Sequence, residues 1–183
     1  GLVGAMKRTP AIRIFTHWDA TGRYVYTLGD LAKLFPEDSP RTLQAGVNRL
    51  VKAGVLQRIC RGIYLYAFSY NKDSHVIEQI AKALRRGAYN YVSLESALSE
   101  YGAISQIPID RLTVMTTGRK GEYKTPYGTI EFTHTKRKLR DILKSMKDVG
   151  RPLRLANPLA AWRDLKRAGR NTHLVDEGML LNA

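Results

Sequence analysis

The sequence contains one cysteine, Cys60, among 183 residues. A lone cysteine excludes an internal disulfide and a cysteine-based zinc site, and it favours a reducing compartment. Apolar runs fall well short of the roughly 18 residues that a membrane span needs, and no secretory signal peptide is evident. We therefore expect a cytoplasmic protein without membrane contact. Residues 1–6 are interpreted as a cloning remnant.

Acidic residues are scarce. The chain has 16 Asp and Glu against 30 Lys and Arg, which gives a formal net charge of +14 and a pI near 10.1. Hydrophobic residues make up 44% and charged residues 25%, a balance typical of globular proteins. Because the cations are in excess over both halves of the chain, a polyanion such as nucleic acid is the expected partner.

Two consecutive helices are predicted in the first half of the chain. Thr27 is expected to cap a helix over residues 27–35, with Asp30 at the spacing of a capping box. Ser39 is expected to cap a second helix, with Pro40 in its first position. Apolar residues recur at helical spacing along this second helix and form its buried side. Its opposite side carries Arg41, Gln44, Ala45, Asn48 and Lys52.

A hairpin is predicted next, because two β-prone runs flank the pair Arg61–Gly62. Together with an earlier helix over 9–19 and a short strand over 24–26, this order is typical of a winged helix-turn-helix. Arg, Gln and Asn side chains can make bidentate contacts with base edges, and cations near a hairpin tip suit phosphates. We therefore predict duplex DNA binding by Ser39, Arg41, Thr42, Gln44, Asn48, Arg49, Arg58 and Arg61.

The second part of the chain mixes helical and strand patterns. Two β-rich runs, 111–117 and 129–134, are separated by glycine-containing turns and are expected to pair antiparallel. The predicted fold class is therefore α+β. A winged helix-turn-helix domain over residues 1–70 is followed by a small mixed α/β domain over residues 71–183, which contains the antiparallel strand pair.

Two stretches, LVKAGVLQRICRGIY at 50–64 and YVSLESALSEYGAISQIP at 91–108, carry a resemblance to a known family. The first is similar to the winged helix, and the second resembles the core motif, of AbiEi-type antitoxins, which belong to type IV toxin–antitoxin and abortive infection systems. TVMTTGRK at 113–120 and TPYGTIEF at 125–132 follow in the same order. ANPLAAWRDL at 156–165 is similar to a further helix of the family, with Leu159 and Ala160 in place of Glu and Lys.

The resemblance implies a transcriptional autorepressor that binds inverted repeats in its operon promoter. It also implies that the C-terminal domain counteracts a nucleotidyltransferase toxin without forming a stable complex with it. Within the family-like motifs, the polar candidates for this antitoxin function are Arg119, Lys120, Ser93 and Glu95.

An alternative function uses the C-terminal half as a metal-dependent nuclease or as an RNA-binding module. A nuclease would use Asp110 and Glu131, although no lysine stands two positions after Glu131. An RNA-binding module would use the cations of residues 136–140. The histidines lack the spacing of a zinc site, and the turn at 118–121 is not a P-loop. We therefore expect no enzymatic activity, no metal and no cofactor. A DNA-binding regulator with a small-molecule sensor domain is a third hypothesis.

Overall fold

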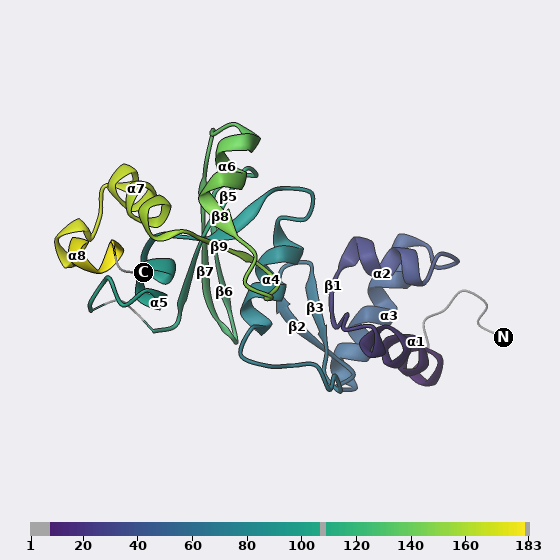
Figure 1. The fold of residues 1–183 in the computed structure, drawn as a ribbon. Helices are drawn as coiled ribbons and strands as arrows, with labels where there is room; N and C mark the ends of the chain where they lie inside the picture. The colour runs from purple at the N-terminus through teal and green to yellow at the C-terminus, as the bar shows by residue number, and fades with distance from the viewer. Residues whose placement is uncertain (1–7, 107–108, 182–183) are drawn as a thin grey trace. The chain divides into compact units, whose positions relative to one another are not determined.

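The computed structural model describes residues 8–106 and 109–181 of the chain (Figure 1). The proposed cloning remnant, residues 1–6, and the last two residues of the 91–108 motif lie outside the described residues. The chain divides into two compact units, Gly1–Val76 and Ile77–Ala183. The sequence placed this boundary after residue 70. Both units combine helices with strands, so the protein is an α+β protein.

In the N-terminal unit, the described residues before Val76 form three helices and three strands. Their order is α1 (Arg8–Ala20), β1 (Val25–Thr27), α2 (Leu28–Leu34), α3 (Pro40–Lys52), β2 (Leu56–Cys60) and β3 (Ile63–Tyr66). β3 lies in the middle of an antiparallel sheet of order β1-β3-β2. Apolar side chains from every element form its core, among them Phe15, Tyr26, Leu31, Val47, Leu56 and Leu65.

The predicted caps set the starts of α2 and α3. The Asp30 amide donates to the Thr27 hydroxyl oxygen at 3.0 Å, and the Thr27 amide donates to the Asp30 carboxylate at 2.9 Å. This capping box was predicted and is confirmed. The Thr42 amide donates to the Ser39 hydroxyl oxygen at 3.2 Å, so the predicted cap of α3 is confirmed as well. A short turn therefore lies between the end of α2 at Leu34 and the Ser39 cap of α3.

A six-stranded mixed sheet organises the C-terminal unit, in the order β6-β7-β5-β4-β9-β8. The strands are β4 (Asn90–Val92), β5 (Arg111–Thr116), β6 (Gly121–Thr125), β7 (Gly128–His134), β8 (Met146–Lys147) and β9 (Arg154–Ala156). The helices are α4 (Val76–Leu84), α5 (Leu94–Glu100), α6 (Leu139–Ser145), α7 (Pro158–Ala168), η1 (Thr172–Leu174) and α8 (Glu177–Leu180). Figure 1 shows α5, α7 and α8 grouped beside the sheet, with α5 packed on α7 and β5.

The predicted antiparallel pairing of the two β-rich runs is wrong. β5 and β7 run parallel, with Arg111 opposite Thr129 and Thr116 opposite His134. The reason is a strand that we did not predict, β6, which occupies the segment that was interpreted as turns. β6 pairs antiparallel with β7 from the other side, so the direction of the chain reverses once more before β7 returns beside β5.

Within the described ranges, no helix combines the length and apolarity needed to cross a bilayer.

Candidate nucleic-acid interface and polar network

The α3 helix presents a polar face opposite its buried side. Leu43, Val47 and Leu50 are buried, whereas Arg41 and Asn48 are exposed and Gln44 is half-buried. The Gln44 Nε2 amide donates to Asn48 Oδ1 at 3.0 Å, one helical turn away. This hydrogen bond orients both amides along the helix, and it leaves the Asn48 Nδ2 group available as a donor. Amides held in this way can match adenine in a major groove.

Ser39 and Thr42 are engaged at the start of the same helix. The Ser39 hydroxyl donates to Thr42 Oγ1 at 2.9 Å while its oxygen accepts the Thr42 amide. Both predicted contact residues therefore stabilise the helix start. Arg49 lies near the other end of α3 and is exposed.

The hairpin after α3 carries the two predicted phosphate contacts. Arg58 on β2 and Arg61 in the turn are both exposed. Gly62 has φ +77°, a conformation that glycine adopts without strain, and it completes the turn after Arg61. A register irregularity between Arg58 and Cys60 marks a bulge in β2. Burial raises the pKa of the half-buried Cys60 thiol, which makes this residue less reactive than an exposed cysteine.

The charge on this segment has one sign only. Residues 39–62 contain five cations, Arg41, Arg49, Lys52, Arg58 and Arg61, and no Asp or Glu. All five side chains are exposed. A segment of this kind attracts phosphates.

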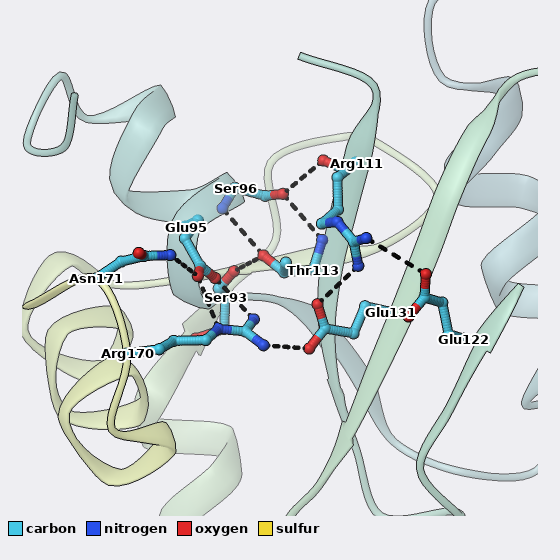
Figure 2. A network of polar contacts seen from close by, with 9 residues as sticks. All are labelled: Ser93, Glu95, Ser96, Arg111, Thr113, Glu122, Glu131, Arg170 and Asn171. Atoms are coloured by element: carbon cyan, nitrogen blue, oxygen red, sulfur yellow. Dashed lines mark hydrogen bonds and ion pairs between the residues drawn. The ribbon is translucent and has the colours of Figure 1, made fainter. Parts of the chain in front are cut away.

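A network of ion pairs holds Glu95 inside the C-terminal unit (Figure 2). The Arg170 guanidinium binds both Glu95 carboxylate oxygens, with Nε to Oε2 at 2.7 Å and Nη2 to Oε1 at 2.9 Å. The Asn171 amide donates to Oε2 at 3.0 Å. Burial acts to raise the pKa of Glu95, but the hydrogen bonds from Arg170 and Asn171 outweigh it and hold the pKa below its ordinary value. The side chain is therefore a fixed internal anion.

The network continues from Arg170 across the sheet. The Arg170 Nη1 group also contacts Glu131 on β7. The second Glu131 oxygen accepts a hydrogen bond from Arg111 on β5 at 3.1 Å. Arg111 reaches onward to Glu122 on β6 at 3.3 Å. Figure 2 shows this chain of alternating charges. The same residues line a cavity of about 330 Å³. Since each of these charges has an opposite neighbour, the network links the segment after α7 to three strands.

Ser93 is fully buried, and its hydroxyl donates to the Asp164 carboxylate at 2.7 Å. The Tyr91 hydroxyl donates to the same Asp164 oxygen at 3.0 Å. Ser93 stands at the N-cap of α5, but its side chain makes no capping hydrogen bond. The next residue, Leu94, has φ +58° while buried, an uncommon conformation that is held by the surrounding core. Ser93 and Glu95 thus form contacts inside the unit.

Arg119 and Lys120 are the two antitoxin candidates at the surface. Both are exposed in the turn between β5 and β6. His134 Nδ1 lies 2.6 Å from the Gly118 carbonyl oxygen, a contact that ties the turn to the end of β7.

The two carboxylates of the nuclease hypothesis differ in their surroundings. Asp110 is exposed just before β5, and Glu131 has both oxygens engaged by guanidinium groups. A metal ion at Glu131 would compete with these two cations. Among the residues described, no group of three or more His, Cys, Asp or Glu is arranged to hold a metal ion.

The fold resembles that of a known structure. A crystal structure of the RV2827C protein from Mycobacterium tuberculosis superposes with a TM-score of 0.56 and 14% sequence identity. The match covers 98% of this chain and 73% of that chain. At this identity the similarity concerns the fold alone. Comparison with protein-family models and with curated proteins found no match.

Three residues that the sequence did not single out are central to these sites. Arg170 closes the network, Asp164 receives the Ser93 hydroxyl, and Arg85 lies against the turn that carries Arg119. Each acts over a sequence separation of 34 residues or more. Local sequence patterns carry no signal for such pairs.

Proposed function

We propose that the N-terminal unit is a winged helix-turn-helix that binds duplex DNA sequence-specifically. α2 and α3 are the helix-turn-helix, α3 is the recognition helix, and the β2–β3 hairpin is the wing. The observation that carries this proposal is the set of five exposed cations in residues 39–62, a segment that contains no Asp or Glu and that forms one helix and one hairpin in this order. In such a domain the recognition helix enters the major groove and the wing contacts the backbone.

The roles within the interface follow from the chemistry of the side chains. Arg41 and Asn48 are the base-reading residues, and Gln44 positions the Asn48 amide through their hydrogen bond. Arg58 and Arg61 contact phosphates. The first group sets the sequence preference, and the second sets affinity for any duplex.

A binding assay separates these roles. Fluorescence anisotropy compares a duplex from the chain's own promoter with a duplex of the same composition in scrambled order. Arg41→Ala and Asn48→Ala should each lower the preference for the promoter by about 1–3 kcal/mol. Lys124→Ala, which removes an exposed cation from β6 in the other unit, is the control and should leave the preference unchanged. An unchanged preference in both α3 variants contradicts the assignment.

We further propose that the chain is the antitoxin and autorepressor of a type IV toxin–antitoxin operon, whose C-terminal unit counteracts a nucleotidyltransferase toxin without a stable complex. The AbiEi-like motifs support this proposal, and Arg119 and Lys120 are its exposed residues. The test is growth of cells that express the neighbouring toxin gene. The double variant Arg119→Ala/Lys120→Ala should fail to rescue growth at equal protein level, whereas Lys124→Ala should rescue it. Full rescue by the double variant contradicts the assignment of these two residues.

A further inference from the structure

A cavity of about 290 Å³ in the C-terminal unit is lined by the end of β7, the segment that follows it and the last turns of α7. Three cations line this cavity. Lys136 and Arg137 come from the segment after β7, and Arg167 comes from α7. Lys136 and Arg167 are exposed, and Arg137 is half-buried. The fold therefore brings cations from two distant parts of the sequence to one space that is open to solvent.

The three cations keep their charges unpaired. None of them forms an ion pair within the described part of the chain. Asp164, which is 3% exposed, is the carboxylate that lines the same cavity. One of its oxygens accepts from the Tyr91 and Ser93 hydroxyls, and the other lies 3.4 Å from Arg163 Nη2. Since Arg163 compensates this carboxylate, the charge of the three lining cations is in excess, and the cavity favours an anion.

Hydrogen bonds hold the backbone that carries two of these cations. His134 Nδ1 lies 2.6 Å from the Gly118 carbonyl oxygen, which can only accept, so this nitrogen carries a proton and the ring is fixed. The hydroxyl oxygen of Thr135, a residue that is 7% exposed, accepts the Arg137 amide at 3.2 Å. Lys136 lies between these two anchored positions. The cations are therefore presented from an ordered segment, as a preorganised binding site requires.

The size and lining of the cavity favour a small phosphorylated molecule. Its volume lies near the lower limit of ligand pockets, which hold about 300–1,000 Å³. A bare phosphate would fill only part of this space, and Met115 and Ala168 offer apolar surface to an organic group. Guanidinium groups bind phosphate oxygens with paired donors, and an ammonium adds a point charge. A nucleic-acid strand is bound along an extended groove, which a cavity of this size does not provide.

We propose that this cavity binds a small organic phosphate, whose phosphate group is held by Lys136, Arg137 and Arg167. The inference goes beyond the proposed DNA-binding and antitoxin functions, and it uses none of the residues assigned to them. It gives a defined site to the hypothesis of a regulator with a small-molecule sensor domain. Ligand binding, operator binding and growth rescue can each fail without the others.

The methionine methyl signals in NMR spectra of the full-length protein test the proposal. The chain has four methionines, and Met115 lines the cavity. Adenosine monophosphate, ribose 5-phosphate and inorganic phosphate are titrated separately at constant ionic strength, with sodium chloride as the control. The Met115 signal should shift and saturate with an organic phosphate, and this ligand should bind more tightly than inorganic phosphate.

Two results of these titrations would overturn the proposal. The first is the absence of a saturating Met115 shift with either organic phosphate, or an equal shift with chloride. The second is binding of inorganic phosphate as tight as that of both organic phosphates, because the cavity would then contribute nothing to recognition of the organic group.

A matched pair of double variants separates this site from general attraction by a basic protein. Lys136→Gln/Arg167→Gln removes two exposed cations that line the cavity, and it should weaken organic phosphate binding about tenfold. Lys138→Gln/Lys166→Gln removes two exposed cations nearby in the sequence that do not line it. This control has the same net charge and should change the affinity by no more than about twofold. Equal losses in the two double variants would assign the binding to net charge and refute the site.

The half-buried cation is tested separately. Arg137→Lys keeps the positive charge but removes the paired donors of the guanidinium, so it should weaken phosphate binding. Unchanged affinity in this variant would contradict the role of Arg137.

A short single-stranded oligonucleotide without terminal phosphates distinguishes a free ligand from a nucleic-acid backbone. At equal concentration of phosphate groups, it should shift the Met115 signal less than the better of the two organic phosphates. A larger saturating shift with the oligonucleotide, abolished in Lys136→Gln/Arg167→Gln, would assign the site to a nucleic-acid strand and contradict the proposal of a small ligand.

Discussion

Arg170 should be the single most important ion-pairing residue of the C-terminal unit. Removing one partner of a fully buried pair costs about 3–5 kcal/mol, because the other charge is left without compensation. Glu95 is 7% exposed, whereas the Arg170 side chain is 35% exposed and Glu131 keeps Arg111 as a partner. Solvent screening therefore reduces the expected loss for Arg170→Ala to about 2 kcal/mol.

The effect should depend on pH in a defined direction. The pKa of Glu95 lies below its ordinary value near 4.5, so the pair stabilises the folded protein above that pH. This stabilisation is lost as the pH falls through the lowered pKa, where Glu95 takes up a proton. The difference between Arg170→Ala and wild type should therefore shrink as the pH falls below about 4.5.

Urea unfolding in a Trp18→Phe background measures this loss, because Trp162 on α7 then reports on the C-terminal unit. Arg170→Lys should recover only part of the stability, since an ammonium cannot bind both Glu95 oxygens in a fork. Arg154→Ala removes an exposed cation from β9 and is the control. A loss below about 0.5 kcal/mol for Arg170→Ala, or a loss that does not change with pH, would refute the reasoning.

Three further predictions follow from other positions. Arg58→Ala should weaken binding to all duplexes alike and reduce the slope of log affinity against log salt by about 0.9, measured by anisotropy at several salt concentrations; an unchanged slope excludes a phosphate contact. Gly128→Ala should lower the free energy of unfolding in urea by about 1–3 kcal/mol, because φ is +122° at this position and the new Cβ would lie 2.9 Å from a backbone oxygen. Gly150→Ala, at φ +74° in open space, should lower it less. Equal losses in the two variants would contradict this reasoning. Ser93→Ala should cost about 1.5–3 kcal/mol by removing a hydrogen bond to a buried carboxylate, and a loss near zero would show that Asp164 does not depend on it.

The sequence was sufficient for the local features of the N-terminal unit. The capping box at Thr27 and the cap at Ser39 were predictable because each depends on side chains only three residues apart. The hairpin was predictable because Arg61–Gly62 separates two β-prone runs. In each case the physical determinant lies within a few residues of the chain.

The sequence was insufficient where the determinant is long-range. β6 is an edge strand in which exposed and half-buried side chains alternate, and its glycine-rich flanks favoured an interpretation as turns. Because β6 was not predicted, the predicted direction of β7 relative to β5 was also wrong. The partners of Glu95 and Ser93, Arg170 and Asp164, are 75 and 71 residues away in the sequence. The roles of Glu95 and Ser93 therefore depend on tertiary contacts between distant segments of the unit.

Repression of the chain's own promoter tests the central proposal most directly. A reporter gene is placed under the DNA upstream of the operon, and the protein is supplied from an independent promoter. Wild type and Lys124→Ala should repress the reporter equally, whereas Arg41→Ala/Asn48→Ala should not repress it at equal protein level. Repression by the double variant as strong as that by wild type, or no repression by wild type, would contradict the proposal that this chain is a DNA-binding autorepressor.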